Sequence, residues 1–319
     1  MSELSPTDLA RDAFVRRNEK FVLTRASAAL VVINLVIVAA FIAATWSSWS
    51  EVLRWYLSLL QAAHSAGTMP PPPQVLQRVA LFAAPVYVAS FVLFAAFEAA
   101  CLRWLVRGES GGGLFGLGLG ADTWRVWLGY WVWLALAAVF CVGVVCFYVA
   151  LNMIGGAITG IAHILVLLVA ALAPLGLIAL LLWGATVFAP AAATSIARKR
   201  FAFASAPKVS RGRRWALLGA FVLVVVGYLV ISAVTQVILR IPIDAAIQPI
   251  VLRALGGEDF KSLATALNHA LSTPTIAVVA VIYMIWAQVL ACVFYVACFG
   301  VNARAVRAAI EDGRIEAAP

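Results

Sequence analysis

The stretch WRVWLGYWVWLALAAVFCVGVVCFYVA, residues 124–150, decides the class of fold. Its only charged residue is Arg125, and apolar side chains would cover every side of a helix formed from it. A helix of about 20 such residues crosses a hydrocarbon core about 30 Å thick. Since this helix would have no polar face for water, its surroundings must be lipid and other helices. The stretch therefore predicts a transmembrane helix.

The composition of the whole chain extends this inference. The 319 residues are 64% hydrophobic and 12% charged, and the mean hydropathy is +1.01. A soluble domain has about 25% charged residues, so this chain lacks the polar groups that would cover a water-facing surface. The composition excludes a soluble globular protein.

Six apolar segments are long enough to span a membrane, which predicts an all-α polytopic membrane protein with short amphipathic interfacial helices. We expect a transmembrane domain over residues 26–301, a cytoplasmic N-terminal tail over 1–25 and a cytoplasmic C-terminal tail over 302–319. Pro174 and Pro190 predict a kink and an end in the fourth span. The expected spans are residues 26–46, 79–102, 124–150, 163–189, 214–237 and 274–301.

The basic residues are distributed unequally between the two sides of the membrane. With the termini on one side, 18 of the 23 Lys and Arg residues fall on that side. Because basic residues are enriched on the cytoplasmic side, we expect cytoplasmic termini. The N-terminal segment lacks the features of a secretory signal peptide, so we expect it to remain attached. The basic residues on the other side are Arg54, Arg78, Arg240, Arg253 and Lys261.

Two segments on the expected outer side have helical periodicity. Residues 49–63 are expected to lie on the membrane surface as an amphipathic helix, and the prolines within 68–73 cannot continue it. Residues 240–273 are expected to form two short amphipathic helices that break at Gly256 and Gly257.

Part of the sequence resembles a known group of membrane proteins. Residues 187–221 end one helix in a Pro-Ala-rich stretch, continue as an amphipathic segment, and open the next span with a Ser-Arg-Gly-x-x-Trp motif over residues 210–215. This pattern, together with residues 98–125, resembles the membrane domains that accompany glycerophosphodiester phosphodiesterases and related stand-alone envelope proteins. The resemblance covers about a quarter of the 319 residues. It implies a multipass architecture in a bacterial inner membrane without the catalytic domain, and it transfers no active-site residue.

The sequence contains no motif that favours a cofactor or a metal. Gly111, Gly113 and Gly116 match the spacing of a dinucleotide fingerprint, but that motif follows a strand, whereas this one follows a predicted transmembrane helix. The three histidines lie in three different segments, with no two at a metal-ligand spacing. The five cysteines lie in or beside apolar runs and are expected to be buried without disulfides. We therefore expect no cofactor and no metal.

Glu98 is the one ionisable residue clearly inside an expected span. Intramembrane charges cost free energy, so they are candidates for function by default. Three interpretations are open: an ion pair between helices, a contact with a ligand or lipid headgroup, or a proton carrier. The ion pair is favoured because Glu98 lies near the interface, where arginines from other helix ends can reach it. Those arginines are Arg25, Arg125 and Arg214.

A basic segment between the fourth and fifth spans predicts a contact with lipid. Residues 197–214 hold seven basic residues, no acidic residue, and the phenylalanines Phe201 and Phe203. Because both ends are fixed at the membrane, we expect the charges to bind anionic headgroups rather than nucleic acid, and the phenylalanines to enter the acyl boundary. The basic residues are Arg198, Lys199, Arg200, Lys208, Arg211, Arg213 and Arg214.

These features favour a non-enzymatic integral inner-membrane protein that binds anionic lipids, envelope protein partners or a second copy of itself. The alternative is a transporter or channel for a small or lipid-like molecule. Such proteins need polar pathways or broken helices, and the break expected near Pro174 and Gly176 keeps this alternative open. An intramembrane enzyme has the least support, because no serine in a span has a neighbouring base. Besides Glu98, the polar residues that the spans offer to a pathway are Asn34, Tyr87, Tyr283 and Gln288.

Overall fold

A computed structural model describes residues 5–16, 21–64, 71–111, 113, 116–158, 160–256, 262–263, 265–266, 269–270 and 273–318. The described chain is helical and contains no β-strand, which confirms the all-α prediction. The α-helices are α1 (Pro6–Arg16), α2 (Val22–Thr45), α3 (Trp49–His64), α4 (Gln74–Leu102), α5 (Ala121–Ala157), α6 (Ile161–Phe188), α7 (Ala191–Ala197), α8 (Ala206–Ser210), α9 (Arg214–Leu255) and α11 (Pro274–Glu311).

The protein is a multipass membrane protein, because six helical segments are long and apolar enough to cross a membrane. Each segment contains one of the predicted spans. The helices are longer than the apolar runs, since polar residues at their ends continue the same helical backbone. The segments are Val22–Ser48, Gln74–Arg107, Ala121–Ala157, Ile161–Ala197, Arg214–Pro242 and Pro274–Glu311.

The chain divides into two compact units. The helices α4, α9 and α11 each begin in one unit and end in the other, so residues 26–301 are divided between the two. Both termini belong to unit 1, together with α5, α6, α7 and α8. Unit 1 comprises Met1–Leu23, Ala95–Val224 and Val296–Pro319, and unit 2 comprises Thr24–Phe94 and Val225–Tyr295.

Small side chains form much of the core of unit 1. Ala95, Ala99 and Ala100 near the end of α4 are at most 1% exposed, and Ala303 and Ala305 near the end of α11 are fully buried. Small residues let helix backbones approach closely. This close packing stabilises helix association in a membrane, because apolar side chains gain little free energy by moving from lipid into the protein. The core of unit 1 therefore depends on close contact between helices.

The N-terminal segment, expected as a tail, contains a helix that packs on unit 1. α1 contacts two other helices at glycines. A Cβ placed at Gly219 of α9 would lie 3.2 Å from Pro6 Cγ, and one at Gly300 of α11 would lie 2.5 Å from Ala13 Cβ. The two glycines thus provide the space into which α1 packs.

The C-terminal segment, expected as a tail over residues 302–319, is also a folded part of unit 1. Its first ten residues continue α11. Within this continuation, Arg307 forms an ion pair with Asp12 of α1. Beyond the helix, the amide of Ala318 donates a hydrogen bond to Ala197 O at 3.1 Å. Both ends of the chain are therefore held against the rest of unit 1.

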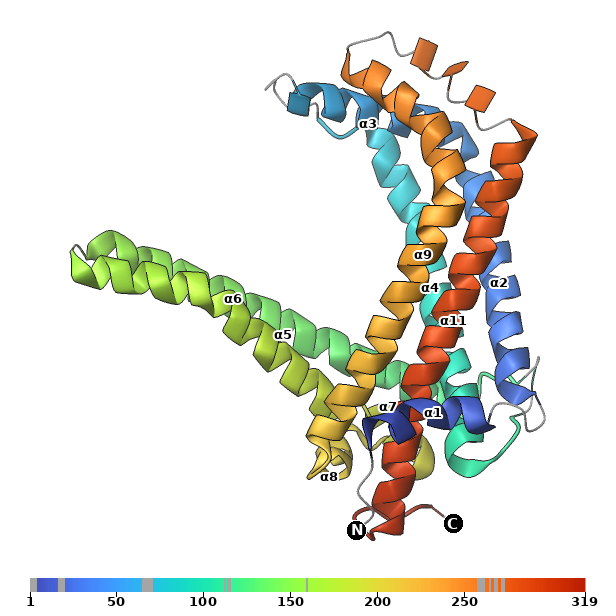
Figure 1. Cartoon of the computed structure of the whole chain (residues 1–319), viewed down its shortest axis with the longest axis vertical. Helices are drawn as coiled ribbons and strands as arrows, with labels where there is room; N and C mark the ends of the chain where they lie inside the picture. The colour runs from blue at the N-terminus through green and yellow to red at the C-terminus, as the bar shows by residue number, and fades with distance from the viewer. Residues whose placement is uncertain are drawn as a thin grey trace. The chain divides into compact units, whose positions relative to one another are not determined.

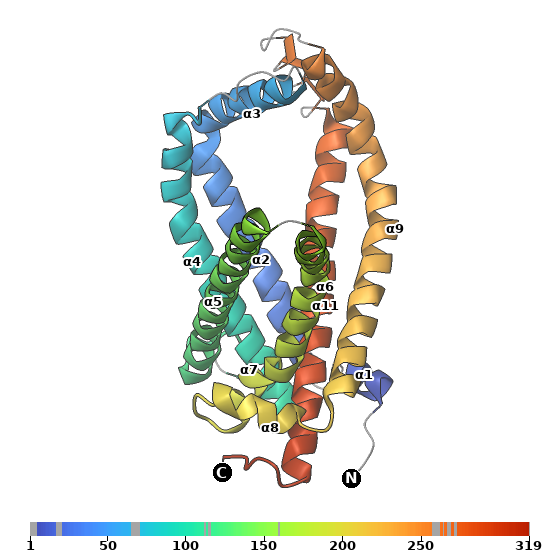
Figure 2. The ribbon, with the colours of Figure 1, turned by 90° about the vertical axis from the view of Figure 1, so that its left-hand side faces the viewer.

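The helices α5 and α6 lie side by side as a long hairpin in unit 1 (Figures 1 and 2). At the turn, His163 Nδ1 lies 2.9 Å from Gly155 O. Pro174 does not end α6, which continues to Phe188 and stops before Pro190, as predicted. No residue in the most apolar part of either helix is buried by the described chain. This surface is available to lipid.

In unit 2, α3 confirms the helix predicted over residues 49–63. The prediction of a separate short helix beginning at residue 240 is wrong, because α9 runs unbroken through Pro242 to Leu255. An ion pair between Arg240 and Asp244, one helical turn apart, spans the expected junction at 3.2 Å and supports the continuous helix. α9 ends just before Gly256, as predicted. Residues 257–261, where the second helix was expected to begin, lie outside the described residues.

Replacing Gly300 by alanine should destabilise the protein, because the new methyl group would overlap Ala13 and displace α1 from α11. Overpacking of this kind costs about 1–3 kcal/mol, so the midpoint temperature of thermal unfolding in detergent should fall. Gly227→Ala is the matched control, since a Cβ at this position in α9 meets no atom within 4 Å. Equal midpoint temperatures for the two variants would contradict the packing of α1 on α11.

Candidate functional site

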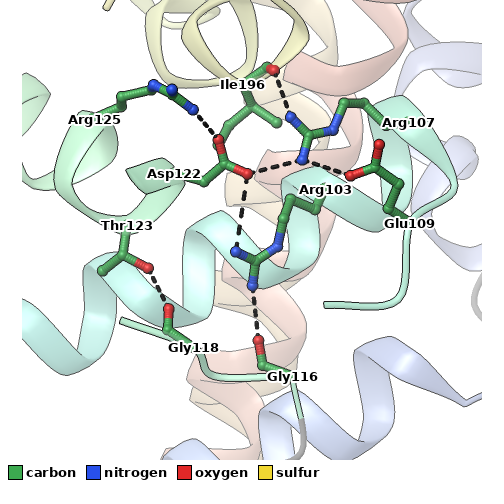
Figure 3. Close-up of polar contacts among 9 residues, drawn as sticks. All are labelled: Arg103, Arg107, Glu109, Gly116, Gly118, Asp122, Thr123, Arg125 and Ile196. Carbon is green, nitrogen blue, oxygen red and sulfur yellow. Dashed lines mark hydrogen bonds and ion pairs between the residues drawn. The ribbon is translucent and has the colours of Figure 1, made fainter. Parts of the chain in front are cut away.

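A buried group of charged residues in unit 1, which we call the arginine clasp, consists of Asp122, Arg103, Arg107 and Arg125 (Figure 3). Asp122 is 7% exposed and lies in the first turn of α5, where the partial positive charge of the helix end favours a carboxylate. Its Oδ1 lies 2.5 Å from Arg125 Nη1. Its Oδ2 lies 2.8 Å from Arg107 Nη2 and 3.9 Å from Arg103 Nη1. Three guanidinium groups therefore share one buried carboxylate.

Gly111 gives Arg103 the room to reach the clasp. Arg103 begins the π-helical turn η2 (Arg103–Arg107) and is 8% exposed. Its Nη2 donates a hydrogen bond to Gly116 O at 2.8 Å. A Cβ at Gly111 would lie only 2.6 Å from the same nitrogen. Both glycines belong to the spacing that resembles a dinucleotide fingerprint. Here Gly111 leaves space for the guanidinium of Arg103, and Gly116 accepts its hydrogen bond.

Arg107 links the clasp to a third element. Its Nη1 donates to Ile196 O of α7 at 3.1 Å, and its Nη2 lies 2.6 Å from the exposed carboxylate of Glu109. The clasp therefore joins the end of α4, the start of α5 and α7. Because its charged groups bond one another and the backbone, the clasp is suited to holding these elements in place.

Asp122, the centre of the clasp, is not among the site residues predicted from the sequence, because it lies just outside the predicted span over residues 124–150. A signal was nevertheless present in the sequence. Asp122 follows a glycine-rich segment, and that segment follows Arg103 and Arg107, which are four residues apart. An acid after such a loop, in the first turn of the next helix, can fold back onto both arginines.

Glu98 is buried as predicted, at 7% exposed, but a hydrogen bond takes the place of the predicted ion pair. Tyr130 Oη donates to Glu98 Oε2 at 2.5 Å and so connects α4 with α5. Arg125 belongs to the clasp, and among the described residues no basic side chain forms an ion pair with Glu98. Arg25, another of the predicted partners, belongs to unit 2, whereas Glu98 belongs to unit 1. A phenol satisfies the carboxyl group without the free-energy cost of burying a second charge.

The basic residues predicted to bind lipid lie in residues 198–214, which we call the basic connector, and their environments differ. Arg198 is half-buried and its Nη1 donates to Ser205 Oγ at 2.9 Å. The phenylalanines differ as well: Phe201 is 41% exposed, whereas Phe203 is buried against Phe188, with ring centres 5.3 Å apart. The exposed basic residues are Lys199, Arg200, Lys208 and Arg211.

Arg213 does not belong to an exposed basic surface. It is 7% exposed, and its Nη2 lies 2.6 Å from Asp312 Oδ2. Burial lowers the pKa of the Arg213 guanidinium from its ordinary value, and the charge of Asp312 opposes this shift. The guanidinium remains charged because an arginine pKa starts so high. This residue therefore joins the basic connector to the C-terminal segment.

Arg214 lies in a pocket of about 320 Å³ between α6 and the start of α9, within unit 1. Its Cζ lies 4.4 Å from the centre of the Trp183 ring, a distance at which a cation–π interaction forms. Its Nε is buried and bonds to no described residue. The remainder of the lining is apolar, since the hydroxyl of Thr186 donates to Leu182 O of its own helix. The lining residues of this Arg214 pocket are Ala179, Leu182, Trp183, Thr186, Arg214, Trp215 and Leu218.

All five cysteines are free, but the expectation that they are buried holds only in part. Cys101 and Cys292 are buried, whereas Cys141 and Cys146 are exposed because the most apolar part of α5 is not covered by the described chain. Within the described residues, no group of three or more His, Cys, Asp or Glu side chains is arranged to hold a metal ion.

Comparison of the chain with protein-family models, with curated proteins and with solved structures finds no match.

Replacing Asp122 by alanine should strongly destabilise unit 1, because Arg103 and Arg125 would lose the one carboxylate with which each forms an ion pair among the described residues. Removing one partner of a buried ion pair costs about 3–5 kcal/mol. Asp244→Ala is the matched control, since its ion pair with Arg240 is exposed and contributes about 0–1 kcal/mol. Thermal unfolding in detergent measures both effects. A fall in midpoint temperature no larger for Asp122→Ala than for Asp244→Ala would show that the clasp does not hold unit 1 together.

The hydrogen bond between Tyr130 and Glu98 predicts that their substitutions are coupled. Tyr130→Phe leaves a buried carboxyl group without its donor, which costs about 1–3 kcal/mol, whereas replacing both partners by apolar groups can be nearly neutral. In a double-mutant cycle with Glu98→Leu, the double variant should therefore lose less stability than the sum of the single variants. Additive losses in the free energy of unfolding would mean that the two side chains do not interact.

Proposed function

We propose that the chain is a non-enzymatic integral protein of the bacterial inner membrane, with cytoplasmic termini, that binds an anionic phospholipid in the Arg214 pocket. The observation that carries this proposal is the combination of one unpaired guanidinium group and an otherwise apolar lining. A phospholipid has the complementary combination of an anionic phosphate and an apolar acyl chain.

The positions of the lining residues support this assignment. Arg214 is the first residue of its membrane-spanning segment, and so lies at the level where phosphate groups are found. Leu182 precedes the end of α6, and Leu218 follows the start of α9. Both therefore lie toward the hydrocarbon core, where an acyl chain can pack. The positive end of the α9 dipole adds to the attraction for a phosphate.

Neighbouring side chains support a location at the lipid interface. Trp215, beside Arg214, is 80% exposed, and tryptophan is enriched at membrane–water interfaces. The four exposed basic residues of the basic connector add about 1 kcal/mol each to attraction toward an anionic surface. The connector would concentrate anionic lipid near the pocket, and Arg214 would select one molecule.

Replacing Arg214 by glutamine should weaken the binding of phosphatidylglycerol about tenfold or more. A hydrogen bond to a charged group contributes about 1.5–3 kcal/mol, and about 1.4 kcal/mol corresponds to a factor of ten. Native mass spectrometry of the full chain, titrated with phosphatidylglycerol, measures the first bound molecule. Arg240→Gln is the control, because Arg240 is exposed and lies in unit 2.

A second variant tests the apolar part of the pocket. Leu218→Trp should fill the space for the acyl chain and lower occupancy while leaving all basic residues in place. The proposal fails if correctly folded Arg214→Gln and Leu218→Trp proteins retain phosphatidylglycerol as well as the Arg240→Gln protein does.

A further inference from the structure

A second cavity, in unit 2, brings together polar side chains that are widely separated in the sequence. Its volume is about 290 Å³, and α2, α4 and α11 contribute to its lining. Asn34 comes from α2, Tyr87 and Ser90 come from α4, and Gln288 comes from α11. Three of these were among the few polar residues that the spans offered in the sequence. We call this space the polar cavity.

These four side chains have no hydrogen-bond partner among the described residues, although each lies within a membrane-spanning segment. Asn34 is near the middle of its span. The side chains of Asn34, Ser90 and Gln288 are half-buried. Hydrocarbon cannot hydrogen-bond an amide or a hydroxyl, so leaving these groups unsatisfied is costly. A molecule within the polar cavity would satisfy them together.

The chemistry of the lining restricts what that molecule can be. No charged side chain lines the cavity, so a charged ligand would lack a counter-charge. Amides and hydroxyls both donate and accept hydrogen bonds, so the ligand should carry both kinds of group. Leu30, Phe91 and Phe94 provide apolar and aromatic surface beside them. The lining therefore fits an uncharged molecule with a small hydrogen-bonding head on an apolar body.

We propose that the polar cavity binds the uncharged glycerol head of a neutral glycerolipid such as diacylglycerol. Its free hydroxyl can donate and accept a hydrogen bond, and its ester carbonyls can accept from the amides of Asn34 and Gln288. Tyr87, at the margin of the cavity, is 74% exposed, so a lipid can enter from the membrane without crossing protein. This site is independent of the Arg214 pocket and has the selectivity that a carrier of a lipid-like molecule would need.

The test is photolabelling of the full chain in nanodiscs with a diacylglycerol analogue that carries a diazirine beside the glycerol. Mass spectrometry should locate the label on α2, α4 and α11 near the cavity. Unlabelled diacylglycerol should compete for the site, whereas phosphatidylglycerol should not. Asn34→Leu combined with Gln288→Leu should reduce the labelling about tenfold, because at least two hydrogen bonds are lost.

Gln236→Leu is the matched control. Gln236 lies in the part of α9 that belongs to unit 2 and donates to Ser232 at 3.1 Å, away from the cavity lining. Photolabelling of the Gln236→Leu variant should equal that of the unchanged chain. The competition experiment needs no substitution, so it remains decisive if the double variant fails to fold. Equal competition by phosphatidylglycerol, or label spread evenly over all spans, would show that the cavity holds only water or bulk lipid and would overturn the proposal.

Discussion

Hydrocarbon offers no hydrogen bonds, so each polar group in a membrane-spanning helix has to be satisfied by the protein or by a ligand. Hydroxyl groups meet this requirement locally: Thr186, Thr194 and Ser195 each donate to a carbonyl four residues earlier in the chain. Ionisable groups cannot do so as easily, and they are satisfied between elements. Glu98 accepts a hydrogen bond from Tyr130, a residue of the next long helix. The same requirement thus fixes which helices of unit 1 come together.

The arginine clasp is the largest structural consequence of this requirement. Three arginines share Asp122, so the end of α4 and the start of α5 cannot separate without leaving charges unpaired. The alanine-rich ends of α4 and α11 pack closely, and α1 and the C-terminal segment pack against the rest of unit 1. The α5–α6 hairpin has no comparable set of contacts along its apolar length, and its surface is left to the membrane.

The six spans could be predicted because length and apolarity are properties of a local stretch of sequence. The clasp could not, since it depends on where Asp122 lies after the glycine-rich segment has turned around Arg103. Phe203 was expected at the acyl boundary, but the turn after α7 carries it into contact with Phe188, while Phe201 remains exposed. Composition indicates that a residue belongs near the membrane. It does not indicate which neighbour the chain will bring to that residue.

Depth along the spans gives the two proposed sites different chemistry. Arg214 is the first residue of its span, where interfacial water lowers the cost of an unpaired charge. Asn34 lies near the middle of its span, where a charge would be costly and an amide is tolerable only with a partner. A phosphate would therefore be stabilised beside Arg214 and excluded from the polar cavity. A neutral glycerol head would gain little from a lone guanidinium but would satisfy several groups near Asn34. Two lipids with the same acyl chains would thus be sorted between the sites by their headgroups.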